Sequence, residues 1–166
     1  MRNTLYLDMD GVVADFNEYA YRVHGFDPEV EYPDKEWNEI AKNPRLYKDL
    51  KKTPYADDLV NFCRTFARMN DMDFYFLTAV PKSNRLHWAF YDKVTWALFF
   101  FTDVPVHFGP FSKDKHIHCN KGDILIDDRL SNIQEWKHAG GIGILHTDYE
   151  KTIASLKNYE NTINRK

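Results

Sequence analysis

Two aspartates stand one residue apart near the start of the chain. Asp8 and Asp10 follow the apolar run Thr4–Leu7 within LYLDMDGVVADF. Such a run predicts a short buried strand, and the end of a strand can hold a carboxylate in a fixed place. Carboxylates held in this way can attack an electrophile, transfer protons or bind a metal ion. The pair alone is weak evidence, because acidic residues after strands are often turn residues or helix caps.

The rest of the chain alternates between strand-like and helix-like segments. Strands are expected at 73–78 (DFYFLT), 104–108 (VPVHF), 123–128 (DILIDD) and 141–147 (GIGILHT), and helices at 15–25, 56–70, 84–101 and 131–140. Strands separated by helices favour a parallel sheet with helices on both faces, so the predicted fold class is α/β. Residues 26–54 are rich in Pro and charged residues and only weakly helical in pattern, which indicates an inserted subdomain.

Polar residues follow four of the expected strands. They are Asp8 and Asp10 after the first, Thr78 after the second, Lys113 and Lys115 after the third, and Asp127 and Asp128 at the end of the fourth. Ligands bind beyond the carboxyl ends of such strands, so these groups should converge on one edge of the sheet. Four carboxylates there would repel one another unless a cation lay between them. Magnesium fits, because it prefers oxygen ligands and leaves positions for water and a substrate phosphate.

A phosphoryl group bound at this edge predicts a role for each acid. One carboxylate attacks phosphorus and forms an aspartyl phosphate, which splits hydrolysis into two steps. A second acid two residues along protonates the departing oxygen and then deprotonates the attacking water. Asp8 fits the nucleophile and Asp10 the acid and base, while Gly11 permits a tight turn around them. Asp15, by contrast, fits an N-cap for the helix that follows it.

Four motifs carry a family resemblance. DMDGVVADF resembles the first motif of the haloacid dehalogenase (HAD) superfamily, LTAVP at 77–81 the second, SKDK at 112–115 the third and ILIDDR at 124–129 the fourth. They occur in the right order and cover the chain from about residue 5 to 129. The combination of DMDGVxADF, a DK pair and LIDDR is most similar to the 5'(3')-deoxyribonucleotidases.

This resemblance implies a Rossmann-like HAD fold, with a core domain at 1–16 and 56–166 and a small helical cap at 17–55 inserted after the first strand. It implies Asp8 as nucleophile, Asp10 as acid/base and backbone-carbonyl metal ligand, and Asp127 or Asp128 on Mg²⁺. It places Thr78, Ala79 and Lys115 on the phosphate and Phe16 on the base and sugar.

Two departures from the family pattern leave alternatives open. After the threonine of the second motif the family commonly has a small hydroxyl residue and then proline, whereas here Ala79 and Val80 precede Pro81. One hydrogen bond to the phosphate is therefore either missing or made by the backbone. The spacing from Lys115 to Asp127 is about two residues longer than the family pattern, which leaves Lys113 as a rival for the phosphate lysine.

Aromatic residues of the expected cap are candidates for stacking on a nucleotide base. They are Trp37, Phe26 and Tyr47, and a role in the core of the cap fits them equally well. His116, His118 and Cys119 have zinc-binding side chains, but a zinc site needs four well-placed ligands, so loop polarity is the simpler interpretation.

Composition limits the classes of protein that fit. The 166 residues suit one domain, and an apolar fraction of 43% with 16% aromatic residues excludes a disordered chain. A net charge of -3 argues against long nucleic acid as a partner but not against a small phosphorylated ligand. The longest apolar run, WALFFF at 96–101, is too short for a membrane span, and no signal peptide pattern begins the chain. Cys63 fits a buried position and no disulfide is expected, so we expect a cytoplasmic protein.

These observations together predict a magnesium-dependent phosphomonoesterase for nucleoside monophosphates, with deoxyribonucleotides preferred. The alternatives are a HAD phosphatase for another small phosphoester such as a sugar phosphate, a nucleotide-binding module without turnover, and a phosphatase for nucleic-acid ends. The sequence leaves the oligomeric state open, with a homodimer among the alternatives.

Overall fold

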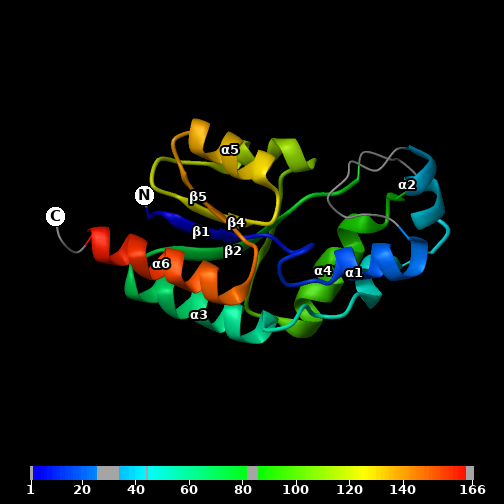
Figure 1. Cartoon of the computed structure of the whole chain (residues 1–166), viewed down its shortest axis with the longest axis horizontal. Coiled ribbons are helices and arrows are strands. Elements are labelled where there is room, and N and C mark those ends of the chain that lie inside the picture. Colours follow the sequence, from blue (N-terminus) through cyan, green and yellow to red (C-terminus); the bar gives the residue numbers. More distant parts are fainter. Residues whose placement is uncertain (1, 26–33, 44, 82–85, 164–166) are drawn as a thin grey trace.

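A five-stranded, all-parallel sheet forms the centre of the molecule (Figure 1). The computed structural model describes residues 2–25, 34–43, 45–81 and 86–163. The strands are β1 (Thr4–Leu7), β2 (Asp73–Thr78), β3 (Val106–Phe108), β4 (Ile124–Asp127) and β5 (Ile142–Leu145), in the order β3-β2-β1-β4-β5. The chain order reverses between β1 and β4, which is where open α/β sheets bind ligands. The predicted α/β fold class is confirmed.

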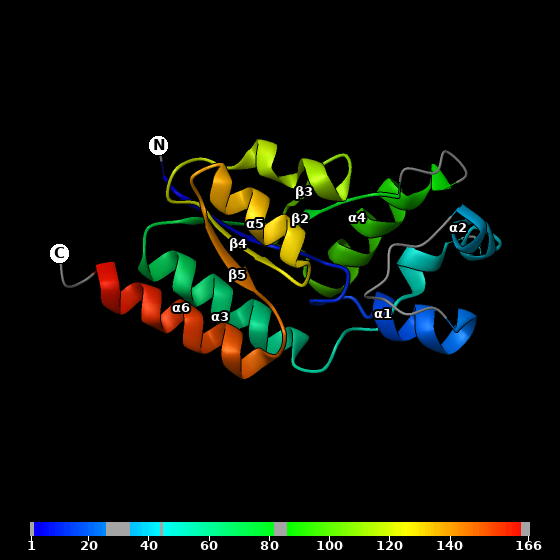
Figure 2. The ribbon, with the colours of Figure 1, turned by 45° about the horizontal axis from the view of Figure 1, so that its top comes forward.

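Helices cover both faces of the sheet. Figures 1 and 2 show α3 (Ala56–Met69) and α6 (Tyr149–Ile163) on one face and α5 (Leu130–His138) on the other, where η4 (Ser112–His118) packs against α5. In α3 the buried side chains recur at helical spacing, with acidic residues in the first turn and a basic residue in the last. No helix among the described residues is long and apolar enough to cross a membrane.

Alternation along the strands separates the buried residues into two clusters. Leu5 and Leu7 point to the larger cluster, whereas Tyr6 between them packs with Ile133 and Trp136 of α5 in the smaller one. All four residues of β1 are buried, as expected for a central strand covered on both faces. The strand therefore has little freedom to move, and the residues directly after it are held in place.

Helical segments follow β1 where the sequence indicated an insertion. They are α1 (Phe16–Tyr19), the π-helix η1 (Ala20–His24), α2 (Asp34–Ile40) and the 3-10 helix η2 (Leu46–Asp49). Asp15 caps α1 by accepting a hydrogen bond from the Glu18 N–H, which confirms that prediction. The expected helix ends at Gly25, which adopts a left-handed φ of 69°. The buried residues of the insertion belong to the same cluster as Leu5, so its separation as a cap domain stays a prediction.

Several elements differ from the sequence expectation in their bounds. Helix α4 (Ala89–Phe100) is shorter than expected, the segment around Lys113 and Lys115 is the 3-10 helix η4 rather than a loop, and α6 was not expected. Strand β3 begins only after Pro105, whose backbone has no N–H to contribute to a sheet. Both cysteines are free and Cys63 is fully buried, as predicted.

Asp123, just before β4, ties that strand to the start of β1. Its carboxylate accepts hydrogen bonds from the Thr4 N–H at 2.7 Å and the Asn120 N–H at 2.9 Å. Its backbone carbonyl accepts hydrogen bonds from the Trp136 indole and from the Ile142 N–H. These contacts fix the relative position of the two strands whose ends carry the candidate site.

We expect Asp123→Ala to lower the free energy of unfolding by roughly 2–4 kcal/mol, because it leaves buried backbone donors without an acceptor. Urea denaturation with an unchanged m-value would measure the loss. Asp58→Ala, on the exposed side of α3, is the control and should change stability by less than about 1 kcal/mol. Equal effects of the two substitutions would contradict this role for Asp123.

Candidate functional site

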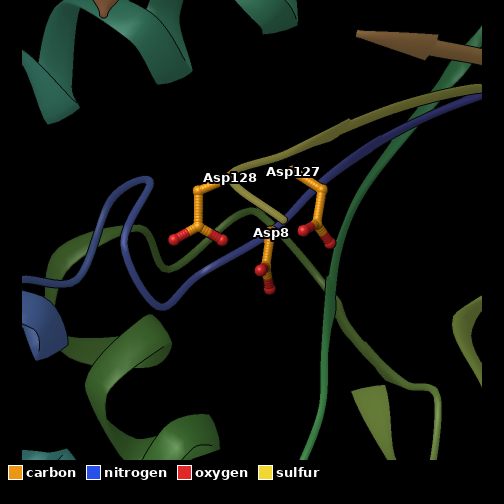
Figure 3. Close-up of side chains that lie close together, drawn as sticks. All are labelled: Asp8, Asp127 and Asp128. Carbon is orange, nitrogen blue, oxygen red and sulfur yellow. The ribbon is translucent and has the colours of Figure 1, made fainter. Parts of the chain in front are cut away.

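Three carboxylates meet at the carboxyl ends of β1 and β4. Asp8, Asp127 and Asp128 each offer one oxygen, and these oxygens all lie within 4.8 Å of one another (Figure 3). The Asp8 N–H donates to the Ile126 carbonyl at 2.9 Å, so strand pairing itself brings the two strand ends together. Asp8 is 5% exposed and Asp127 is fully buried. This geometry could hold a metal ion, since oxygen atoms this close can share one cation.

A buried lysine pairs with two of these carboxylates. Lys115 of η4 places its Nζ 2.7 Å from Asp8 Oδ1 and 2.7 Å from Asp127 Oδ2. Burial opposes the charge, but the two carboxylates outweigh burial and raise the pKa of Lys115, which stays protonated. Gly109 allows the approach, because a Cβ there would lie 2.8 Å from Lys115 Cα. Lys113, the rival from the sequence, is exposed.

Asp127 and Asp128 differ in how many of their oxygens are already engaged. Asp127 Oδ1 accepts from the Arg129 N–H at 2.8 Å, and both Asp127 oxygens are 3.0 Å from the Asn132 amide nitrogen. With Lys115 on Oδ2 as well, Asp127 is held from several sides. Asp128 accepts only from Asn17, at 3.3 Å, among the described residues. Asp128 therefore has more lone pairs left for a cation than Asp127 has.

Two further residues shape this cluster. Asn132 was not predicted from sequence, although its place in the first turn of the helix after LIDDR is a signal that could have found it. Ser112 Oγ donates to the Asn132 amide oxygen at 3.0 Å. Gly11 has a φ of 75°, and a Cβ there would lie 2.0 Å from Asp128 Oδ2. A side chain at position 11 would therefore displace the Asp128 carboxylate.

Charge repulsion and burial shift the protonation of the cluster. Burial raises the pKa of Asp8 to about 8, with repulsion from Asp127, Asp128 and Asp10 adding to it and Lys115 opposing it. Burial and the Asp127 charge raise the pKa of Asp128 to about 6. A bound cation would favour the ionised forms of both groups, so metal and protons compete for this site.

Asp10 and Thr78 meet a second buried lysine, which the sequence analysis missed. Lys93 of α4 is 1% exposed; its Nζ pairs with Asp10 Oδ2 and donates to Thr78 Oγ1 at 3.0 Å. The Asp10 side chain is thus engaged with Lys93, apart from the three-carboxylate cluster. Lys93 lies in the mostly apolar helix AFYDKVTWALFF. Because a lysine is rarely buried without a charged partner, a lysine in such a helix could have indicated an ion pair with one of the acids of the site.

Two aromatic residues of the insertion pack on Phe16, just before it. Phe16 stacks on Tyr47, with ring centroids 5.7 Å apart, and on Trp37, with centroids 6.2 Å apart. Phe16 and Tyr47 are buried and Trp37 is half-buried, while Phe26 lies outside the described residues. The structure thus shows the packing role that the sequence left open for Tyr47 and Trp37. Contact of Phe16 or Trp37 with a substrate stays a prediction, as does the role of Ala79, which follows Thr78 at the end of β2.

The histidines near η4 form no metal cluster among the described residues. His116 Nδ1 lies 2.7 Å from the Lys113 carbonyl and His118 Nε2 lies 2.9 Å from the Phe108 carbonyl. Each of these two imidazole rings is thus engaged by a backbone carbonyl.

The fold is similar to that of a hydrolase of known structure. A hydrolase from Streptococcus pneumoniae TIGR4 matches 95% of this chain and 100% of its own length, with a TM-score of 0.50 and 14% sequence identity. No protein-family model and no curated protein matches the sequence. A likeness at this level of identity shows a common fold.

We expect the metal-free protein to lose stability as the pH rises from about 4 to about 8. In this range the unfolded chain has released the carboxyl protons that folded Asp8 and Asp128 still hold, so the unfolded state binds fewer protons. Millimolar MgCl₂ should raise the melting temperature more at about pH 8 than at about pH 5, because binding must displace protons at the lower pH. Asp128→Asn should reduce the magnesium-induced shift, and a shift independent of pH would contradict this view of the cluster.

Proposed function

We propose that this protein is a magnesium-dependent phosphomonoesterase that forms an aspartyl phosphate on Asp8. The observation that carries the proposal is the meeting of three carboxylates and buried Lys115 at the point where the strand order reverses. The likeness of its fold to a protein described as a hydrolase, and the four HAD-like motifs, support the same conclusion. Lys115 supplies a positive charge for the phosphoryl oxygens, and the strand ends supply a rigid position for the attacking carboxylate.

Each acid has a separate task in this proposal. The Asp8 and Asp128 side chains and the Asp10 carbonyl would hold Mg²⁺, with Asp127 supporting Lys115 and the cluster. The ion would neutralise charge on the phosphoryl oxygens. Met9 N–H and Lys115 both contact Asp8 Oδ1, which leaves Oδ2 for attack on phosphorus.

The reaction then proceeds in two balanced displacements. Asp8 Oδ2 forms a bond to phosphorus while the bond to the leaving oxygen breaks, and Asp10 gives that oxygen a proton. Water next attacks the same phosphorus, gives a proton to Asp10, and the bond to Asp8 breaks to release phosphate. Thr78 and the backbone at Ala79 would bind phosphoryl oxygens together with Lys115.

We propose nucleoside monophosphates, with deoxyribonucleotides preferred, as substrates. The motifs DMDGVVADF and LIDDR and the aromatic residues beside the site support this choice. The packing of Phe16 against Tyr47 and Trp37 favours a second candidate, a smaller phosphoester such as a sugar phosphate, because rings that stack on one another offer less surface to a base.

We expect wild-type protein to release phosphate from nucleoside monophosphates only when Mg²⁺ is present, and Asp8→Asn to lose this activity by at least about 10³-fold, because the amide cannot attack phosphorus. A panel of deoxyribonucleotides, ribonucleotides and sugar phosphates would be assayed for released phosphate. Faster hydrolysis of sugar phosphates would favour the second candidate. Nucleotide binding without turnover in either protein would favour a binding module instead.

We expect Lys115→Met to reduce kcat by about 10²-fold or more, because it removes the buried positive charge next to Asp8 and Asp127. Lys113→Met is the matched control in the same short helix, since its side chain is exposed, and it should retain activity. Steady-state kinetics of both variants would decide between the two lysines. Greater loss in the Lys113 variant would contradict the assignment.

A further inference from the structure

Lys93 is the second buried cation of the site, and the mechanism above gives it no task. Its Nζ contacts Asp10 Oδ2 and Thr78 Oγ1, and its side chain is 1% exposed. A buried ammonium is costly unless its hydrogen bonds and charge are matched, and these two partners match it. Lys93 is therefore fixed in place, and so is the carboxylate with which it pairs.

The two oxygens of Asp10 are in different situations. Oδ2 is engaged by Lys93, whereas Oδ1 is buried and accepts no hydrogen bond from any described residue. A buried oxygen without a donor is uncommon in folded proteins and calls for an explanation. The ion pair with Lys93 provides one, since it fixes the Asp10 carboxyl group in an orientation that leaves Oδ1 without a donor.

Lys93 also contacts the insertion. Its Nζ lies 4.4 Å from the centroid of the Tyr47 ring, within the range of a cation–π interaction. The segment around Tyr47 is attached to α4 on either side of Lys93, since Arg45 pairs with buried Asp92 and the Trp96 indole donates to the Leu50 carbonyl at 2.8 Å. The position of Lys93 thus depends on the packing of η2 against α4.

We propose that Lys93 is a positioning residue that acts through Asp10. Its ammonium holds Oδ2 and so fixes the orientation of the Asp10 carboxyl group toward the leaving oxygen, and Tyr47 makes this arrangement depend on the docked insertion. The inference rests on the proposed function, because it assigns Asp10 the proton transfer of that mechanism. Correct placement of an acid matters because proton transfer requires hydrogen-bond contact with the reacting oxygen.

The dependence of the rate on the leaving group tests this role. An alkyl oxygen, as in a nucleoside 5'-monophosphate, must be protonated as it departs, whereas dinitrophenolate can leave without a proton. We expect Lys93→Met to lower kcat/KM for the nucleotide by about 10²-fold and kcat/KM for 2,4-dinitrophenyl phosphate by less than about threefold. The comparison uses kcat/KM because this constant reports the first displacement alone, before Asp10 acts as base on water. Lys93→Gln, which keeps a donor for Oδ2, should lose less than Lys93→Met on the nucleotide.

The comparison is internal to each variant, so partial unfolding lowers both rates equally and leaves their ratio unchanged. Lys52→Met is the matched control, since Lys52 also pairs with an aspartate, Asp57, and lies near the aromatic ring of Phe100, but outside the site. It should change neither rate. Equal loss on both substrates in the Lys93 variants, or no loss, would overturn the inference. Absence of activity on both substrates in the wild type would instead overturn the proposed function.

Discussion

Repulsion among buried carboxylates is the constraint on which this protein's arrangement depends. Asp8, Asp127 and Asp128 offer oxygens within 4.8 Å of one another, and Asp8 and Asp127 are buried while Asp128 is half-buried. Such a group is stable only if protons, a metal ion or fixed cations offset its charge. The fold provides one fixed cation in Lys115, which lowers the pKa of Asp8, but burial first and repulsion from the other carboxylates second keep that pKa raised.

The sheet determines where this charge gathers. Parallel strands end at the same edge, and the order β3-β2-β1-β4-β5 places the ends of β1 and β4 side by side. Asp123 fixes the opposite ends of these two strands through Thr4, so the register of the carboxylates follows from hydrogen bonds outside the site. The close approach of Gly11 to Asp128 then limits how far that carboxylate can move. A rigid cluster can bind a cation without reorganising first.

Helix α4 links this edge to the insertion. Two consecutive charged residues in an otherwise apolar helix, Asp92 and Lys93, are both buried, and they pair in different directions. Asp92 pairs with Arg45 of the insertion, and Lys93 pairs with Asp10 at the site. Because Tyr47 lies against Lys93, the docking of the insertion and the placement of Asp10 share the same contacts. The strand ends and the insertion are therefore physically connected through α4.

The sequence by itself determined the α/β class, the strands and the acids that follow them, because apolar runs and the residues at their ends are local features. It also predicted the N-cap at Asp15 and the reduced cysteines. It could not tell which of Lys113 and Lys115 is buried beside Asp8 and Asp127, and it missed Lys93, Asn132 and α6. These features depend on the tertiary structure, since Lys93 and Asp10 lie 83 residues apart and their contact depends on how α4 packs. The sequence shows which side chains can carry a charge, whereas the packing of distant segments decides which of these charged side chains come into contact.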